Sequence, residues 1–137
     1  MVRLTKSKVI NTSGTRKRSI ARLTLTAGNG LVRINGQMLD SFEPKLARMR
    51  IQEPLILLGD LASKVHIDVN VHGGGVMSQV DAIRQAMGKA LSEFGGEKVK
   101  RMLLEYDRSF LVADTRFKET RKPNDSKARA MRQKSYR

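Results

Sequence analysis

A strict alternation of apolar and polar residues between positions 19 and 26 predicts a half-buried strand. A shorter strand is predicted at residues 8–12. The pair Ser13-Gly14 after it is typical of a turn. The cations Arg16, Lys17 and Arg18 are then expected at a turn that leads into the second strand. The two faces of that strand are Ala21, Leu23 and Leu25 against Arg22, Thr24 and Thr26, with Arg22 opposite the core.

Two later stretches also alternate apolar and polar residues. Val32 and Ile34 form the inward face of a strand, and the Asn35-Gly36 pair after them is the strongest short hairpin signal. With the strands before them they predict an antiparallel meander. Residues 64–72 alternate again, with Val65, Ile67, Val69 and Val71 on one face and His66, Asp68, Asn70 and His72 on the other.

A first helix is predicted after Pro44, a residue suited to the first helical turn. Pro54 is expected to break or kink it, so that two short pieces end near Gly59. Its apolar face is predicted to hold Leu46, Met49 and Ile51, with Arg48 and Arg50 off that face.

The longest helix is predicted at residues 76–94, after the turn Gly73-Gly74-Gly75. Gly95 is a natural C-terminal stop, and residues 97–106 repeat the helical pattern. The buried stripes are predicted to be Val76, Val80, Ile83, Met87, Ala90, Leu91 and Phe94, then Val99, Met102, Leu103 and Tyr106.

The apolar signal fades after residue 112, and from Lys122 onward the chain is expected to be extended. Residues 127–137 carry a cation at every second or third position and cannot bury enough apolar surface to order alone. Arginine at positions 129, 132 and 137 suits bidentate phosphate contacts. An arm that orders on a polyanion is therefore favoured over a tail that only aids solubility.

Charge is concentrated at the two ends of the chain of 137 residues, whose net charge is +14. Residues 1–22 hold seven cations and no acid, residues 115–137 hold nine cations and two acids, and residues 23–114 are neutral. The tail lacks the apolar face that a membrane surface needs, so nucleic acid is the predicted partner. No apolar run approaches the ~20 residues of a membrane span, no secretory signal is recognised, and a cytoplasmic location is expected.

Three patterns in the sequence could suggest a catalytic or metal site. His72 and the glycines after it resemble an esterase oxyanion loop, but the G-x-S-x-G nucleophile that this chemistry needs is missing from the sequence. The glycines fit better as a strand-to-helix turn that can hold a phosphate, or as a means of close packing. His66 and His72 would lie roughly 20 Å apart along one strand, too far to bind one metal ion.

Asp107 and Asp114 have no histidine or nucleophile near them in sequence, so they are expected to pair with Arg108 and Arg116. The chain has no cysteine for a disulfide or a thiolate metal site. We therefore predict no catalytic residue, no metal and no cofactor.

Ten short motifs are spread over nearly the whole chain: Gly14-Thr15-Arg16-Lys17-Arg18-Ser19-Ile20-Ala21-Arg22, Val32-Arg33-Ile34-Asn35-Gly36, Gly73-Gly74-Gly75, Gln79, Ala82-Ile83-Arg84, Ala90-Leu91, Tyr106-Asp107-Arg108, Asp114-Thr115-Arg116, Lys122-Pro123 and Arg132-Gln133-Lys134-Ser135-Tyr136-Arg137. In these residues and in their order, the chain resembles the small-subunit ribosomal protein nine family. The closing Ser-Tyr-Arg is similar to the archaeal and eukaryotic branch.

The resemblance implies an α+β domain at residues 1–114, with helices packed on a small mixed sheet, and a long extended tail at residues 115–137. The domain type is that of the second domain of ribosomal protein five, with a left-handed β-α-β crossover. The implied role is structural, in the head of the small ribosomal subunit. The implied partners are ribosomal RNA, the peptidyl-site transfer RNA and neighbouring head proteins, with no membrane and no small-molecule substrate.

The resemblance also assigns roles to residues, with Arg137 at the anticodon stem-loop of the transfer RNA. A free-standing nucleic-acid-binding or chaperone module and a phosphate-handling enzyme are the rival interpretations. The latter lacks a G-x-x-x-x-G-K motif. The implied ribosomal RNA contacts are Arg16, Lys17, Arg18, Arg22, Gly73, Gly74, Gly75, Arg84, Arg108, Arg116, Lys122, Lys127, Arg129 and Arg132, and the transfer RNA contacts are Lys134, Tyr136 and Arg137.

Overall fold

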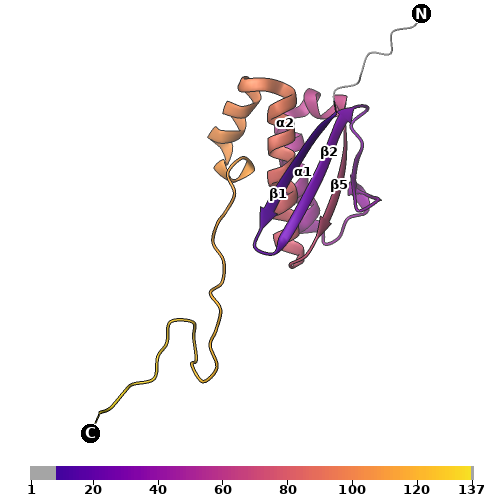
Figure 1. Cartoon of the computed structure of the whole chain (residues 1–137). Helices are drawn as coiled ribbons and strands as arrows, with labels where there is room; N and C mark the ends of the chain where they lie inside the picture. Colours follow the sequence, from indigo (N-terminus) through magenta and orange to yellow (C-terminus); the bar gives the residue numbers. More distant parts are fainter. Residues whose placement is uncertain (1–8, 137) are drawn as a thin grey trace, which may run out of the picture.

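Five strands form one sheet in the order β1-β2-β5-β3-β4 (Figure 1). The computed structural model describes residues 9–136. Helices α1 (Lys45–Leu58) and α2 (Val76–Tyr106) pack against one face of this sheet. The predicted α+β class, with a mixed sheet and packed helices, is confirmed.

The first hairpin joins β1 (Ile10–Arg16) to β2 (Ser19–Ala27). The turn predicted at Ser13-Gly14 is wrong, because both residues lie inside β1 and the chain reverses at Lys17 and Arg18. Gly14 is required there by a close approach, since a Cβ at this position would stand 2.1 Å from the Ala82 carbonyl oxygen on α2. The expected strand at residues 8–12 thus begins later and runs longer, and residue 8 lies outside the described range.

Strand β5 (Val65–His72) separates β2 from β3 (Val32–Ile34), so the predicted meander is wrong. β5 is antiparallel to β2 and parallel to β3. The chain reaches it through α1 and the 3-10 segment Gly59–Lys64, a long-range return that no local turn signal reports. The Asn35-Gly36 hairpin to β4 (Gln37–Met38) is confirmed. The left-handedness of the crossover stays a prediction.

Helix α1 follows Pro44 and ends before Gly59, as predicted, but Pro54 does not break it. Pro54 is buried, so its ring packs in the core and offsets the backbone hydrogen bond that a proline cannot donate. Leu46 and Met49 are 64 % and 55 % exposed, which corrects their predicted burial. Ile51 is buried as predicted, and the other buried residues of the helix are Ala47, Pro54 and Leu58.

Helix α2 is interrupted at Gly96 (φ 76°), one residue after the predicted stop. Between Val80 and Leu91 it is buried almost all round, because the sheet, α1 and the 3-10 turn Arg108–Phe110 surround it. In the predicted stripe, burial is confirmed for Val80, Ile83, Met87, Ala90, Leu91, Val99 and Leu103, and Phe94 is half-buried against the core. The exposed or half-exposed members are Val76, Phe94, Met102 and Tyr106.

After Asp114 the described chain to residue 136 forms neither helix nor strand, and nearly all its side chains are exposed. It runs away from the sheet and helices in Figure 1. The division into a domain and a tail at residues 114 and 115 stays a prediction. Within residues 9–136, none of the helices has the length and apolarity needed to cross a membrane.

Candidate nucleic-acid interface

The cationic turn between β1 and β2 lies against the glycine turn between β5 and α2. A Cβ on Gly73 would stand 2.4 Å from the Arg18 carbonyl oxygen, and one on Gly74 would stand 2.2 Å from Ser19 Oγ. Ser19 is buried, and its Oγ donates a hydrogen bond to the Gly73 carbonyl oxygen at 2.9 Å. The first two glycines therefore allow the two turns to pack closely.

Both of these glycines also have positive φ, 77° for Gly73 and 62° for Gly74, a backbone region that favours glycine. Gly75 meets nothing within 4 Å and precedes α2, whose first residues Val76 and Met77 are 47 % and 40 % exposed. Phosphate binding at this helix start stays a prediction.

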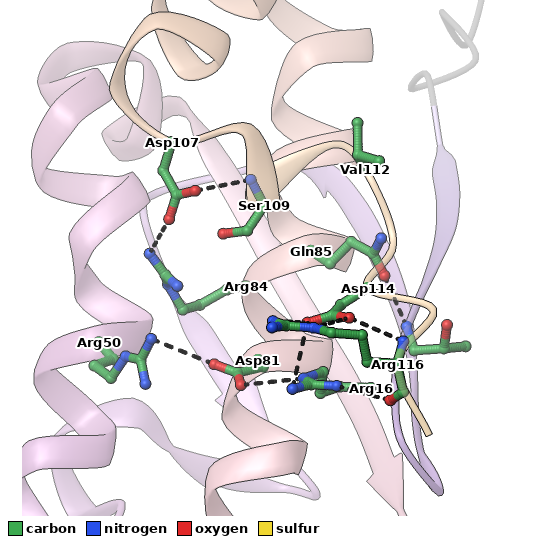
Figure 2. Close-up of a pocket in the computed structure, with 11 residues that line it drawn as sticks. Arg16, Arg50, Asp81, Arg84, Gln85, Asp107, Ser109, Val112, Asp114 and Arg116 are labelled. Atoms are coloured by element: carbon green, nitrogen blue, oxygen red, sulfur yellow. Dashed lines mark hydrogen bonds and ion pairs between the residues drawn. The ribbon is translucent and has the colours of Figure 1, made fainter. Parts of the chain in front are cut away.

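Lys17 and Arg18 are exposed at the tip of the hairpin, with Lys17 in the left-handed region at φ 52°. Arg16 differs, because its side chain is only 18 % exposed and is held by protein groups (Figure 2). Its guanidinium lies 3.3 Å from Asp114 Oδ2 and 3.8 Å from Asp81 Oδ2, and its Nη1 donates to the Arg116 carbonyl oxygen at 3.3 Å. Of the three cations of this turn, Arg16 thus faces its own protein.

Asp114 pairs with Arg116, as predicted. Its Oδ1 accepts a hydrogen bond from the Arg116 backbone N–H at 3.0 Å, and its Oδ2 lies 2.7 Å from Arg116 Nη2. These hydrogen bonds, and then the charges of Arg116 and Arg16, hold the pKa of Asp114 well below its ordinary value. Arg116 itself is 84 % exposed in its side chain, so it can also face a phosphate.

Asp107 pairs with Arg84 rather than with Arg108, which corrects the second predicted pair. Its Oδ2 lies 3.4 Å from Arg84 Nη2, and its Oδ1 accepts a hydrogen bond from the Ser109 backbone N–H at 2.8 Å. Burial alone would raise the pKa of Asp107, but the hydrogen bonds from Ser109 and the charge of Arg84 outweigh it and the pKa is lowered.

Arg84 is 5 % exposed and is held by groups of its own protein, while its predicted RNA contact stays a prediction. Its Nη2 lies 2.5 Å from Glu53 Oε2, and its guanidinium carbon lies 4.6 Å from the centre of the Phe110 ring. Tyr106 donates a hydrogen bond to the same Glu53 carboxylate, which raises the pKa of Tyr106. Arg84 therefore joins α1, α2 and the turn after α2.

A hollow of about 190 Å³ lies between these groups, at the junction of β1, α2 and the start of the tail (Figure 2). Its charged lining is almost balanced: Arg16, Arg50, Arg84 and Arg116 against Asp81, Asp107 and Asp114. Such a lining is that of an ion-pair network rather than of an open anion site. Arg50, Asp81 and Glu53 were missed by the sequence reasoning, because their partners come from distant parts of the chain.

The remaining predicted contacts on the domain stand apart. Arg22 lies on the open face of β2, opposite Ser13 and Asn70 of the neighbouring strands, three residue pairs from the end of the hairpin. Arg33, on the same polar face, was not singled out, although the alternation that exposes Arg22 also exposes it. Arg108 is exposed in the turn after α2.

The tail presents its predicted contacts to solvent. Tyr136 is 89 % exposed, and Arg137 lies outside the described residues. Arg129 is paired with Glu119, at 2.5 Å between Nη2 and Oε1. The other predicted tail contacts, all exposed, are Lys122, Lys127, Arg132 and Lys134.

Among the described residues, no group of three or more histidine, aspartate or glutamate side chains is placed to hold a metal ion. His66 instead pairs with Asp68 of the same strand, at 2.9 Å between Nε2 and Oδ2.

Comparison with known proteins gives a consistent match along the chain. The model of the family described as ribosomal protein S9/S16 matches residues 14–137. The chain is 49 % identical over 133 residues to the small ribosomal subunit protein uS9 of Methanococcus vannielii, covering 95 % of this chain and 99 % of that protein. It is 47 % identical to the proteins of the same name from Methanococcus maripaludis and Methanothrix thermoacetophila, with the same coverage.

Proposed function

The chain belongs to the ribosomal protein S9/S16 family, and from this premise we propose that it binds ribosomal RNA with its basic turn and tail and touches the peptidyl-site transfer RNA with the tail's tip. Its role is structural, in translation, and it is not an enzyme. The relatives are archaeal, in agreement with the branch that the Ser-Tyr-Arg ending predicted.

The observation that carries the proposal is the meeting of the two cationic ends. Residues 1–22 and 115–137 each carry a net charge of +7. The two segments are far apart in sequence, yet the Arg16 side chain of the first donates a hydrogen bond to the Arg116 carbonyl oxygen of the second. The exposed cations Lys17 and Arg18 thus lie at the corner from which the tail starts. Exposed cations on the domain, close to the start of a cationic tail, suit the phosphate backbone of folded RNA.

The tail supports the proposal by its exposure and its composition. Within residues 115–136 the cationic side chains are exposed, and no apolar cluster holds the segment to the domain. Backbone contacts carry no base information, so a tip that binds phosphates would serve every transfer RNA alike. A single charge-assisted hydrogen bond at the tip should contribute about 1.5–3 kcal/mol.

Removal of Ser135–Arg137 tests the transfer RNA contact. Small subunits carrying the shortened protein should assemble normally but bind peptidyl-site transfer RNA roughly tenfold or more weakly, since each 1.4 kcal/mol is a factor of ten. A matched control is the double variant Lys98→Ala, Arg101→Ala, which removes two exposed cations of α2 and leaves the tail intact. Unchanged transfer RNA binding by the shortened protein would refute the contact.

A free-standing nucleic-acid chaperone would share the charge pattern but would be found outside ribosomes. Sedimentation of cell extracts separates the two functions, because a subunit protein should migrate with the small subunit at all growth stages. A pool mostly in the free fractions would favour the chaperone.

A further inference from the structure

Arg16 is built into the fold in a way that its neighbours Lys17 and Arg18 are not. Its side chain is 18 % exposed, whereas the next two residues are exposed at the tip of the hairpin. A cation that serves RNA alone has no need of protein partners on three sides. The contacts of Arg16 therefore point to a second task.

Those contacts hold the first residues of the tail. Residues 16 and 114 form a parallel β-bridge, so the chain after α2 pairs once with the free edge of β1. The Arg16 guanidinium reaches Asp114 Oδ2 at 3.3 Å and the Arg116 carbonyl oxygen at 3.3 Å. Asp114 in turn fixes the backbone two residues on, by accepting from the Arg116 N–H. Backbone and side chain thus act together on residues 114–116.

The other side of this contact is anchored in the domain. Asp81 of α2 lies 3.8 Å from Arg16 and 3.5 Å from Arg50 of α1, so one carboxylate joins Arg16 to both helices. The end of β1 is fixed as well, because the Thr15 N–H donates to Gln85 Oε1 at 2.8 Å and Gln85 is buried. Figure 2 shows Asp81 between Arg16 and Arg50, with Asp114 and Arg116 beside Arg16.

We propose that Arg16 and Asp114 clamp the start of the tail to the end of β1 and so set the direction in which the tail leaves the domain. Arg16 is then a positioning residue. Without the clamp, the buried Phe110 and the half-buried Leu111, which packs against the core, would be the last firm attachments, and residues 112–116 would be free to pivot. A wider sweep lowers the effective concentration of the tip at its target.

The clamp is a property of the free protein, and only its consequence for transfer RNA rests on the proposed function. It can therefore be tested without RNA. The chain has no cysteine, so two introduced cysteines can carry spin labels on the full-length protein. Suitable exposed positions are Thr24 on the open sheet face and Lys118 in the tail.

The distance distribution between these labels should be narrow in the parent protein. Arg16→Ala and Asp114→Asn should each roughly double its width, as expected for a segment released from its contacts. Arg18→Ala removes an adjacent cation outside the clamp and should leave the width unchanged. A second label pair, Thr24→Cys with Glu93→Cys, should keep its distance in all variants if the domain stays folded.

Subunits with Asp114→Asn then separate positioning from RNA contact. This variant removes the ion pair between Arg16 and Asp114 but no cation, so weaker binding of peptidyl-site transfer RNA with normal assembly would support positioning. An unchanged label distribution in both Arg16→Ala and Asp114→Asn overturns the clamp, whatever the tail deletion does. A broad distribution with unchanged transfer RNA binding would leave the clamp but remove its role in aiming the tail.

Discussion

Gly14 of β1 faces the Ala82 carbonyl oxygen of α2 so closely that a Cβ at position 14 would stand 2.1 Å from it. The same Cβ would stand 2.7 Å from the Ala86 backbone nitrogen. Both obstacles belong to helix backbone, which cannot rotate away as a side chain can. The backbones of β1 and α2 can therefore approach each other this closely only because residue 14 has no side chain.

Gly14→Ala should lower the free energy of unfolding by about 1–3 kcal/mol, the usual cost of overpacking a core. Gly75→Ala is the matched control, since nothing lies within 4 Å of a Cβ there and its φ is −103°. Its effect should stay within about 0.5 kcal/mol. Urea unfolding of both variants checks this, and equal stabilities would contradict the close approach.

Arg84→Met should destabilise the protein although it keeps an apolar stem at a buried position. Removing one partner of a fully buried ion pair costs about 3–5 kcal/mol. Here about 2–3 kcal/mol is expected, because the Glu53 and Asp107 side chains are 30 % and 37 % exposed and can be partly hydrated. Arg108→Met, at an exposed site, should change the stability by less than about 0.5 kcal/mol in the same thermal or urea unfolding. Equal effects would contradict the structural role of Arg84.

Acid should destabilise the protein through Asp107. Its pKa is lowered in the folded state, so the native protein favours the ionised carboxylate. That stabilisation is fully present above the ordinary aspartate pKa of about 3.9 and is lost as the pH falls through the lower folded-state pKa. Asp107→Asn should therefore flatten the fall in unfolding free energy between about pH 5 and pH 2, measured by urea unfolding. A parallel curve displaced downward would show that Asp107 is not a source of the pH dependence.

Lys17→Gln with Arg18→Gln should weaken binding to ribosomal RNA and reduce its salt dependence. Each phosphate contact contributes about −0.7 to the slope of log K against log salt for single strands, so the slope should fall in magnitude by about 1.4. The nine tail cations would contribute at most about −6 by the same rule. The control Lys98→Gln with Arg101→Gln keeps the same net charge as the test variant. An equal change in both slopes would mean that overall charge, rather than the turn, decides binding.

The local pattern of apolar and polar residues predicted side-chain burial correctly where burial repeats with the period of a single strand or helix. The alternation in β2 and β5 predicted the inward residues Leu23 and Ile67 because one face of each strand packs on helices. The hairpin at Asn35-Gly36 was predicted because these two residues readily adopt the backbone conformation that a two-residue turn requires. Pairing between distant segments was not predictable in this way, so the insertion of β5 between β2 and β3 was missed.

The candidate site divides along the same line. Exposure of Lys17, Arg18 and the tail cations follows from a local lack of apolar residues. The opposite fate of Arg16 and Arg84 depends on acids 23 to 98 positions away in sequence, which only the folded chain brings near. A basic motif thus indicates the kind of partner, while the fold decides which of its members remain free to meet it.

The pair between Glu119 and Arg129 makes the length of the tail adjustable. Ten residue steps separate the two side chains, a segment that could span roughly 34 Å when stretched. While Glu119 and Arg129 are paired, the segment between them is not fully extended, and the tip of the tail lies closer to the domain than its full length would allow. An exposed pair of this kind is weakened by water and salt, so a phosphate competing for Arg129 would be enough to open it. The RNA surface that the tail binds would then itself lengthen the tail, by breaking this ion pair.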